Sequence, residues 1–65
     1  MLTQKQKLLI RCLKASEMGE DEVVGTMLFL KSEEMQDEML EWMKSHSTAS
    51  PDEVLRNVWR MKGFI

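Results

Sequence analysis

The sequence predicts an all-α protein, a compact bundle of four short helices arranged as two helical hairpins. Leucine, methionine, glutamate and lysine, which favour helix, are abundant, whereas tyrosine is absent and β-branched residues seldom alternate with polar ones. Apolar residues recur at spacings of three and four, the period of an amphipathic helix. Capping residues, glycines and one proline divide the chain into four such segments.

The chain is expected to form one domain over residues 1–65, because this length supports a single small core. Hydrophobic residues make up 43% and charged residues 31%, the balance of a soluble globular domain. A chain of this size buries only about 60% of its unfolded surface, so nearly every large apolar residue is needed for the core. Stability is therefore expected to depend on self-association.

The first helix is predicted to begin at Thr3, because its hydroxyl group and the side chain of Gln6 have the spacing of a capping box. Apolar residues fall on one broad face and basic residues on the opposite face. Gly19 follows, and it is expected to end this helix, begin the next one, or do both. The apolar face comprises Leu8, Leu9, Cys12, Leu13 and Ser16, and the basic face Lys7, Arg11 and Lys14.

The second helix is predicted from Glu20 to about Lys31, and the other helices are expected to pack around it. Three consecutive carboxylates open its first turn, where exposed backbone amides favour negative charge. The stretch that follows, residues 23–30, is apolar on nearly every side and has Thr26 as its polar edge. Such a helix belongs inside a fold or against a partner, so it is expected to form the apolar centre of the bundle.

The third helix is predicted to begin after Ser32 and to end near Ser45. One face carries methionines at intervals of four, and the opposite face is strongly acidic. Methionines at helical spacing are ordinary core residues, although they also form the deformable surfaces of promiscuous helix-binding proteins. The apolar face comprises Met35, Met39, Trp42, Met43 and His46 with Leu40 beside it, and the acidic face Glu34, Asp37, Glu38 and Glu41.

The fourth helix is predicted after a small polar loop that runs from Ser45 to Ser50. Ser50 is a serine cap, Pro51 stands at the first helical position, and Glu53 occupies the capping-box position. Gly63 is expected to end the helix and to leave a short apolar tail. Val54, Leu55, Val58, Trp59 and Met61 are expected to face inward, and Arg56, Asn57 and Arg60 outward.

Catalysis is not expected from these side chains. The one histidine, His46, has no motif that joins it to Cys12 or to a serine, so no nucleophile is paired with a base. No glycine-rich phosphate loop is present. A single cysteine permits neither an internal disulfide nor a cysteine-cluster metal site, and a reducing cytoplasm suits it best. The sequence therefore predicts no enzyme, no metal and no cofactor.

A membrane partner is also not expected. The longest uninterrupted apolar run, Met27 to Leu30, is far shorter than the roughly 20 residues that a spanning helix needs. The first residues are basic and then apolar, but Arg11 interrupts them before a signal-peptide core is complete. The sequence therefore favours a cytoplasmic protein.

The predicted function rests on large apolar residues for which a core of this size has little room. Four short helices cannot easily bury Ile10, Phe29, Phe64, Ile65 and one of the two tryptophans, taken here as Trp42. Large apolar groups exposed in one patch usually mark an interface. The chain is therefore predicted to be a small, non-catalytic protein-protein interaction module that forms a homodimer. An adaptor, meaning a monomer whose apolar groove receives a helix of another protein, is an alternative that the sequence leaves open.

A helix-turn-helix protein that binds nucleic acid is the other alternative. Ala15 and Gly19 have the spacing of the small residue and turn glycine of that motif, which would make the second helix the recognition helix. That helix begins with carboxylates, which phosphates would repel, so nucleic acid is disfavoured. A weaker form of the alternative uses one basic patch on the first and fourth helices to bind the phosphate backbone: Lys7, Arg11, Lys14, Arg56 and Arg60.

Overall fold

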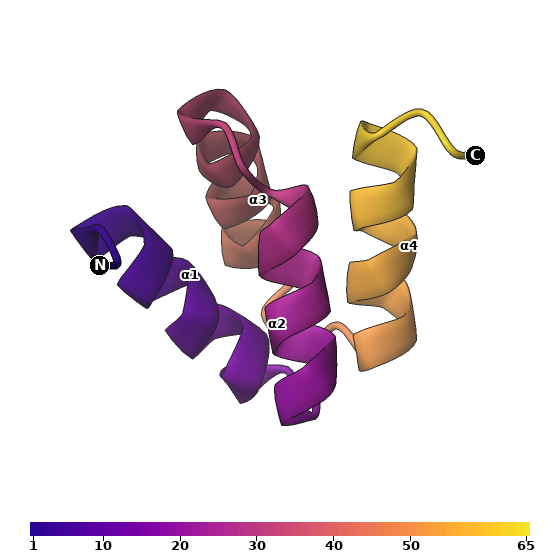
Figure 1. The fold of residues 1–65 in the computed structure, drawn as a ribbon. Helices are drawn as coiled ribbons and strands as arrows, with labels where there is room; N and C mark the ends of the chain where they lie inside the picture. Colours follow the sequence, from indigo (N-terminus) through magenta and orange to yellow (C-terminus); the bar gives the residue numbers. More distant parts are fainter.

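Four α-helices and no β-strand make up the computed structural model, which describes residues 1–65. The all-α class and the four helices predicted from the sequence are thereby confirmed. The globule measures 29 × 24 × 23 Å along its principal axes (Figure 1). The helices are α1 (Gln4–Ala15), α2 (Glu20–Phe29), α3 (Glu33–Ser45) and α4 (Pro51–Met61).

The helices begin where the sequence predicts, because nearby side chains satisfy backbone amides of their first turns. Thr3 and Gln6 form a reciprocal capping box, in which the Gln6 nitrogen lies 3.1 Å from Thr3 Oγ1 and the Thr3 nitrogen 2.8 Å from Gln6 Oε1. Ser50 and Glu53 form the same pair ahead of α4. The hydroxyl group of Ser32 accepts a hydrogen bond from the first turn of α3.

Gly19 begins α2 and does not end α1. Its φ is −68°, and its N–H donates to the carboxylate of Glu22 over 2.9 Å. The chain leaves α1 through Ser16 and Glu17 instead, and Glu17 has a φ of 66° in the left-handed region. The chain therefore turns at Glu17 and not at Gly19. Ala15 and Gly19 do not take the places of the small residue and the turn glycine that their spacing indicates for a helix-turn-helix motif.

The core lies where the inner faces of the four helices meet. α1 packs against both α2 and α3, and α2 also packs against α4. α3 and α4 meet mainly through side chains, for example through Met39 and Asn57, and do not form the closely packed second hairpin that the sequence predicts. The ten buried apolar residues are Leu9, Leu13, Met18, Val23, Leu30, Met39, Met43, Ala49, Val54 and Val58.

α2 is not enclosed as the apolar centre of the bundle, contrary to the sequence-based expectation. Val23 and Leu30 are buried, but Val24 is 57% and Leu28 64% exposed. α2 lies between α1 and α4 at the front of Figure 1, and nothing covers its outer side. α1 and α4 are the main helices that pack against α2, so the all-round apolar pattern leaves one apolar side in solvent.

Two further residues expected on inward faces lie at the surface. Leu8 of α1 is 47% exposed and Trp59 of α4 is 43% exposed, whereas Leu9 and Val58 beside them are buried. The reason is the same in both helices. Each packs against neighbours over a narrow stripe, and an apolar residue at the margin of the sequence pattern falls outside that stripe.

Polar residues occupy several buried positions. Gln36 donates from Nε2 to the carbonyl group of Leu30 over 2.8 Å, which satisfies the C-terminal end of α2. Asn57, predicted to face outward, is only 3% exposed, and Thr26, predicted as a polar edge, is also buried. These side chains therefore belong to the packed interior.

A Schellman motif ends α4 and fixes the apolar tail. Gly63 has a φ of 81°, and its N–H donates to the Arg60 carbonyl over 3.1 Å. The Phe64 N–H donates to the Trp59 carbonyl over 2.9 Å. The chain turns back as a result, and the Phe64 ring meets the Phe29 ring edge to face with their centroids 5.8 Å apart. The tail is therefore ordered against the end of α2.

Replacing Gly63 or Gly25 with alanine is expected to change the free energy of unfolding in opposite directions. Gly63→Ala places a Cβ at positive φ, so we expect the free energy of unfolding to fall by about 1 kcal/mol. Gly25 lies within α2, where an added Cβ would meet no atom within 4 Å, so Gly25→Ala should raise it by about 0.5–1 kcal/mol. Urea denaturation followed by circular dichroism measures both. A stabilising Gly63→Ala would contradict the Schellman turn.

Thr26 carries the one buried side-chain oxygen or nitrogen atom without a hydrogen-bond partner. Thr26→Val replaces the hydroxyl group with a methyl group of similar size, so we expect the free energy of unfolding to rise by about 1 kcal/mol. The melting temperature should increase by about 4–8 °C. Thr26→Ser keeps the hydroxyl group and removes the methyl group, and should melt lower than the parent. A lower melting temperature for Thr26→Val would show that the hydroxyl group has a partner.

Candidate interaction surface

The structure brings the five residues predicted as an interface together in two pairs and leaves one apart. Phe29 and Phe64 are in ring contact and both are exposed. Trp42 and Ile65 line a different hollow, between α3 and α4. Ile10 is half-buried and packs against the core of the bundle. Only the first pair therefore lies beside the exposed side of α2.

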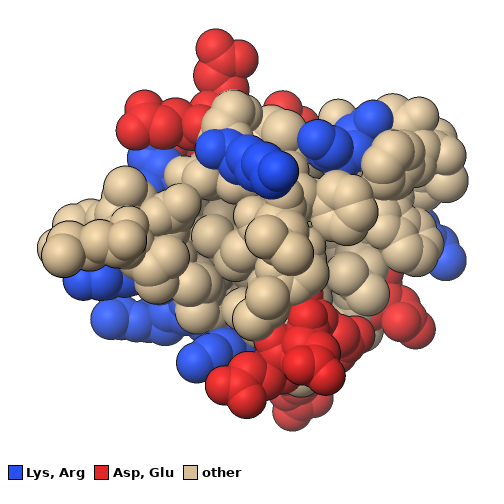
Figure 2. Space-filling view, in the orientation of Figure 1, with Lys and Arg blue, Asp and Glu red and all other residues tan.

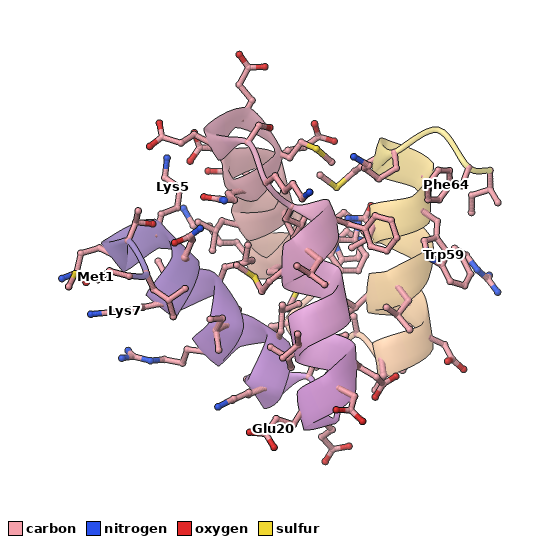
Figure 3. The ribbon with its side chains drawn as sticks, viewed as in Figure 1. Met1, Lys5, Lys7, Glu20, Trp59 and Phe64 are labelled. Carbon is pink, nitrogen blue, oxygen red and sulfur yellow. The ribbon has the colours of Figure 1, made fainter.

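An apolar face extends from that exposed side of α2 to α4. In addition to Phe29 and Phe64, it includes three residues that the sequence analysis assigned to the interior. We call it the α2–α4 face, and it comprises Val24, Leu28, Phe29, Trp59 and Phe64, all of them exposed. Figure 3 shows Trp59 and Phe64 on the same side of α4, the side away from α2, and the ring contact between Phe64 and Phe29 joins them to the end of α2. The spacing of Val24 and Leu28, one helical turn apart, is the sequence signal that identifies the face once α2 is known to be open.

Figure 2 shows uncharged residues covering the middle of this side of the molecule. Gly25 lies between Val24 and Leu28 and adds no side chain, so the backbone of α2 can be approached closely there. Exposed apolar residues grouped on one side and rimmed by polar ones often mark interaction sites. The face is therefore the strongest candidate site on the molecule.

The two ends of α2 carry charges of opposite sign. Glu20, Asp21 and Glu22 are exposed at its N-terminus, and Lys31 is exposed just after its C-terminus. In Figure 2 acidic side chains gather below the uncharged area and basic ones lie at its upper edge, while further basic side chains lie at its lower left and further acidic ones at its upper left. None of these four residues takes part in an ion pair within the chain. The carboxylate of Glu22 also caps α2 through Gly19, so the charges of Glu20, Asp21 and Lys31 are the ones most available to a partner.

The two ion pairs that do form lie elsewhere. Lys5 Nζ is 2.7 Å from Asp37 Oδ1 and joins α1 to α3, and Lys44 Nζ is 3.4 Å from Glu41 Oε1 within α3. The hydrogen bond to Asp37 raises the pKa of Lys5 above its ordinary value. Lys5 is partly buried and the other three residues are exposed, so both pairs are open to solvent and contribute little to stability.

Comparisons with protein-family models, curated proteins and solved structures found no match for this chain. No three of its histidine, cysteine, aspartate and glutamate side chains are grouped so that they could hold a metal ion. None of the four helices combines the length and the apolarity needed to span a membrane.

The basic residues considered as a nucleic-acid patch do not gather in one place. Lys7 and Arg11 line a hollow beside Leu40 of α3. Arg56 and Arg60 line another hollow, between α3 and α4. Two separate basic groups do not make the continuous stripe along which a nucleic-acid backbone is bound.

Proposed function

We propose that this chain is a non-catalytic protein-interaction module that forms a homodimer through the α2–α4 face. The observation that carries the proposal is the exposure of Val24 and Leu28 on α2 next to the aromatic pair Phe29 and Phe64. A small domain has little apolar surface to spare, so leaving these groups in water is costly unless another surface covers them.

The charges beside the face favour a second copy of the chain as the partner. If two α2 helices cross in opposite directions about a two-fold axis near their middle, Val24 of each copy meets Leu28 of the other. The same axis brings the acidic end, including Asp21, towards Lys31 of the second copy. Symmetric pairing of this kind makes one surface complementary to itself, and opposite charges at its rim fix its orientation.

The size of the molecule is compatible with this arrangement. A standard interface removes about 800 Å² from each partner. The chain exposes 4613 Å², so a dimer of that kind would cover about a sixth of its surface. The absence of a side chain on Gly25 permits a short distance between the two α2 helices. The dimer is expected to act in the cytoplasm, where the free thiol of Cys12 stays reduced.

Molar mass measured by light scattering across a wide concentration range tests the proposal. We expect a dimer at high concentration that dissociates on dilution. Asp21→Lys and Lys31→Glu should each weaken association by about tenfold, because each variant creates two like-charge contacts in a symmetric dimer. The double variant exchanges the two charges and should restore most of the affinity.

Glu38→Lys is the matched control, because it makes the same charge reversal on the exposed acidic face of α3. It should leave the dissociation constant unchanged. A monomer at every concentration would reject the homodimer and favour the adaptor, whose apolar face waits for a helix of another protein. An equal loss from Glu38→Lys and Asp21→Lys would reject the antiparallel arrangement.

A further inference from the structure

The hollow between α3 and α4, already described for Trp42 and Ile65, is separate from the α2–α4 face. We call it the α3–α4 cleft, and its volume is about 410 Å³, within the range of small-molecule sites. It shares no residue with the α2–α4 face. Its lining residues are Trp42 of α3, His46 just after α3, Glu53, Arg56, Asn57 and Arg60 of α4, and Ile65 of the tail.

Arg60 is held in place by a buried amide. Asn57 is 3% exposed, and its Nδ2 donates to Met39 Sδ over 3.3 Å and to Met61 Sδ over 3.5 Å. Its Oδ1 accepts a hydrogen bond from the guanidinium group of Arg60. Because the amide group is fixed from the core, the guanidinium group is pre-positioned at the cleft and needs little ordering when a ligand binds.

The cleft carries unpaired positive charge. Arg56 lies one helical turn before Arg60 on the same side of α4, and neither arginine forms an ion pair. Glu53 is the one carboxylate among the polar lining residues. Its Oε1 accepts the backbone N–H of Ser50 over 3.2 Å, so this carboxylate is engaged in the cap of α4. Two guanidinium groups against one carboxylate leave the cleft with a net positive charge that suits an anion.

A stacked pair of rings forms the opposite wall. The rings of Trp42 and His46 lie 4.1 Å apart between centroids and are inclined by only 7°. His46 Nδ1 is 2.9 Å from the carbonyl oxygen of Trp42. Since a carbonyl oxygen can only accept, Nδ1 carries the proton, and this bond holds the imidazole ring against the indole ring. This wall of the cleft is therefore aromatic, and the contact between the two rings holds it in place.

We propose that the α3–α4 cleft binds a small aromatic phosphate monoester. The guanidinium groups of Arg56 and Arg60 receive the phosphate, whose three terminal oxygens match their paired N–H donors. Two arginines one turn apart offer more donors than a single carboxylate accepts, which favours a phosphate as the anion. The Trp42–His46 wall receives the aromatic ring of the ligand.

Phenyl phosphate is the probe for this proposal, with inorganic phosphate and phenol as its two halves. Nitrogen-15 NMR of the whole chain follows the indole N–H of Trp42 and the side-chain N–H groups of the arginines. We expect saturable shifts of Trp42, Arg56 and Arg60 with phenyl phosphate, and at least about tenfold weaker binding of either half.

Arg60→Lys keeps the charge and loses the fork of donors, so it should weaken binding by about tenfold or more. Arg11→Gln removes one positive charge on α1 and should leave binding unchanged. Equal binding of inorganic phosphate would overturn the assignment of an aromatic ligand. Shifts spread over all basic residues, or equal losses from Arg11→Gln and Arg60→Lys, would overturn the site itself.

Discussion

Leu28→Glu is expected to convert the self-associated protein into a monomer. Leu28 is 64% exposed on α2, so a glutamate there should lower the stability of the monomer only slightly. In the proposed dimer the same carboxylate would be buried against apolar groups twice, once in each copy. An unpaired buried charge costs about 3–5 kcal/mol, so the association constant should fall by at least about a hundredfold. Sedimentation equilibrium or light scattering measures the change.

Leu8→Glu is the matched control for this variant. Leu8 is an exposed leucine of comparable accessibility on α1, but it lines the hollows between α1 and α3 together with Leu40. Its substitution should leave the molar mass unchanged. If both glutamates dissociated the protein equally, or if Leu28→Glu had no effect on a protein that does self-associate, the α2–α4 face would not be the interface.

Leu13→Ala is expected to have the largest effect on stability. Leu13 is fully buried on α1, between the helices that α1 packs against. Removing a fully buried leucine side chain costs about 2.7–5 kcal/mol. A single core of this size rarely supplies more than about 3–5 kcal/mol, so we expect the variant to be largely unfolded at 25 °C. Circular dichroism and urea denaturation measure the loss.

Leu2→Ala, at an exposed leucine before α1, provides the comparison. It should change the free energy of unfolding by no more than about 0.5 kcal/mol. A Leu13→Ala variant that unfolded cooperatively at the parental urea midpoint would show that α1 is not anchored through this residue.

The helix boundaries could be predicted from the sequence because local chemistry determines them. Thr3 with Gln6 and Ser50 with Glu53 satisfy backbone amides only three residues away, so no distant part of the chain is needed. Gly63 likewise marks the end of α4, because glycine readily adopts the positive φ that this helix end requires.

The burial of residues at the edges of the apolar faces could not be predicted in this way. It depends on which other helices pack against each helix. The helical pattern places Leu8 and Leu9 on one apolar face, but α2 and α3 cover only the stripe that contains Leu9. Asn57 is a polar residue on the amphipathic α4 and was expected in solvent. Its burial follows from Met39 and Met61, which come to lie on either side of its amide group.

The exposure of Phe29 and Phe64 could be predicted from the sequence, whereas that of Val24 and Leu28 could not. Phe29 and Phe64 were identified because they were surplus to a small core, and they do lie together at the surface. Val24 and Leu28 were missed because an apolar pattern around a whole helix suggested enclosure. Trp42 was assigned to the same face, but it stacks on His46 in the α3–α4 cleft.

The separate positions of the two tryptophans give the molecule two independent optical reporters. Trp42 lies in the α3–α4 cleft against an imidazole ring, and Trp59 lies on the α2–α4 face beside the tail. Indole fluorescence depends on the polarity and the neighbours of the ring. In a Trp42→Phe background the emission would report the covering of Trp59, and in a Trp59→Phe background it would report events in the cleft. The intrinsic fluorescence of these two variants can therefore report on the two surfaces separately, without an added label.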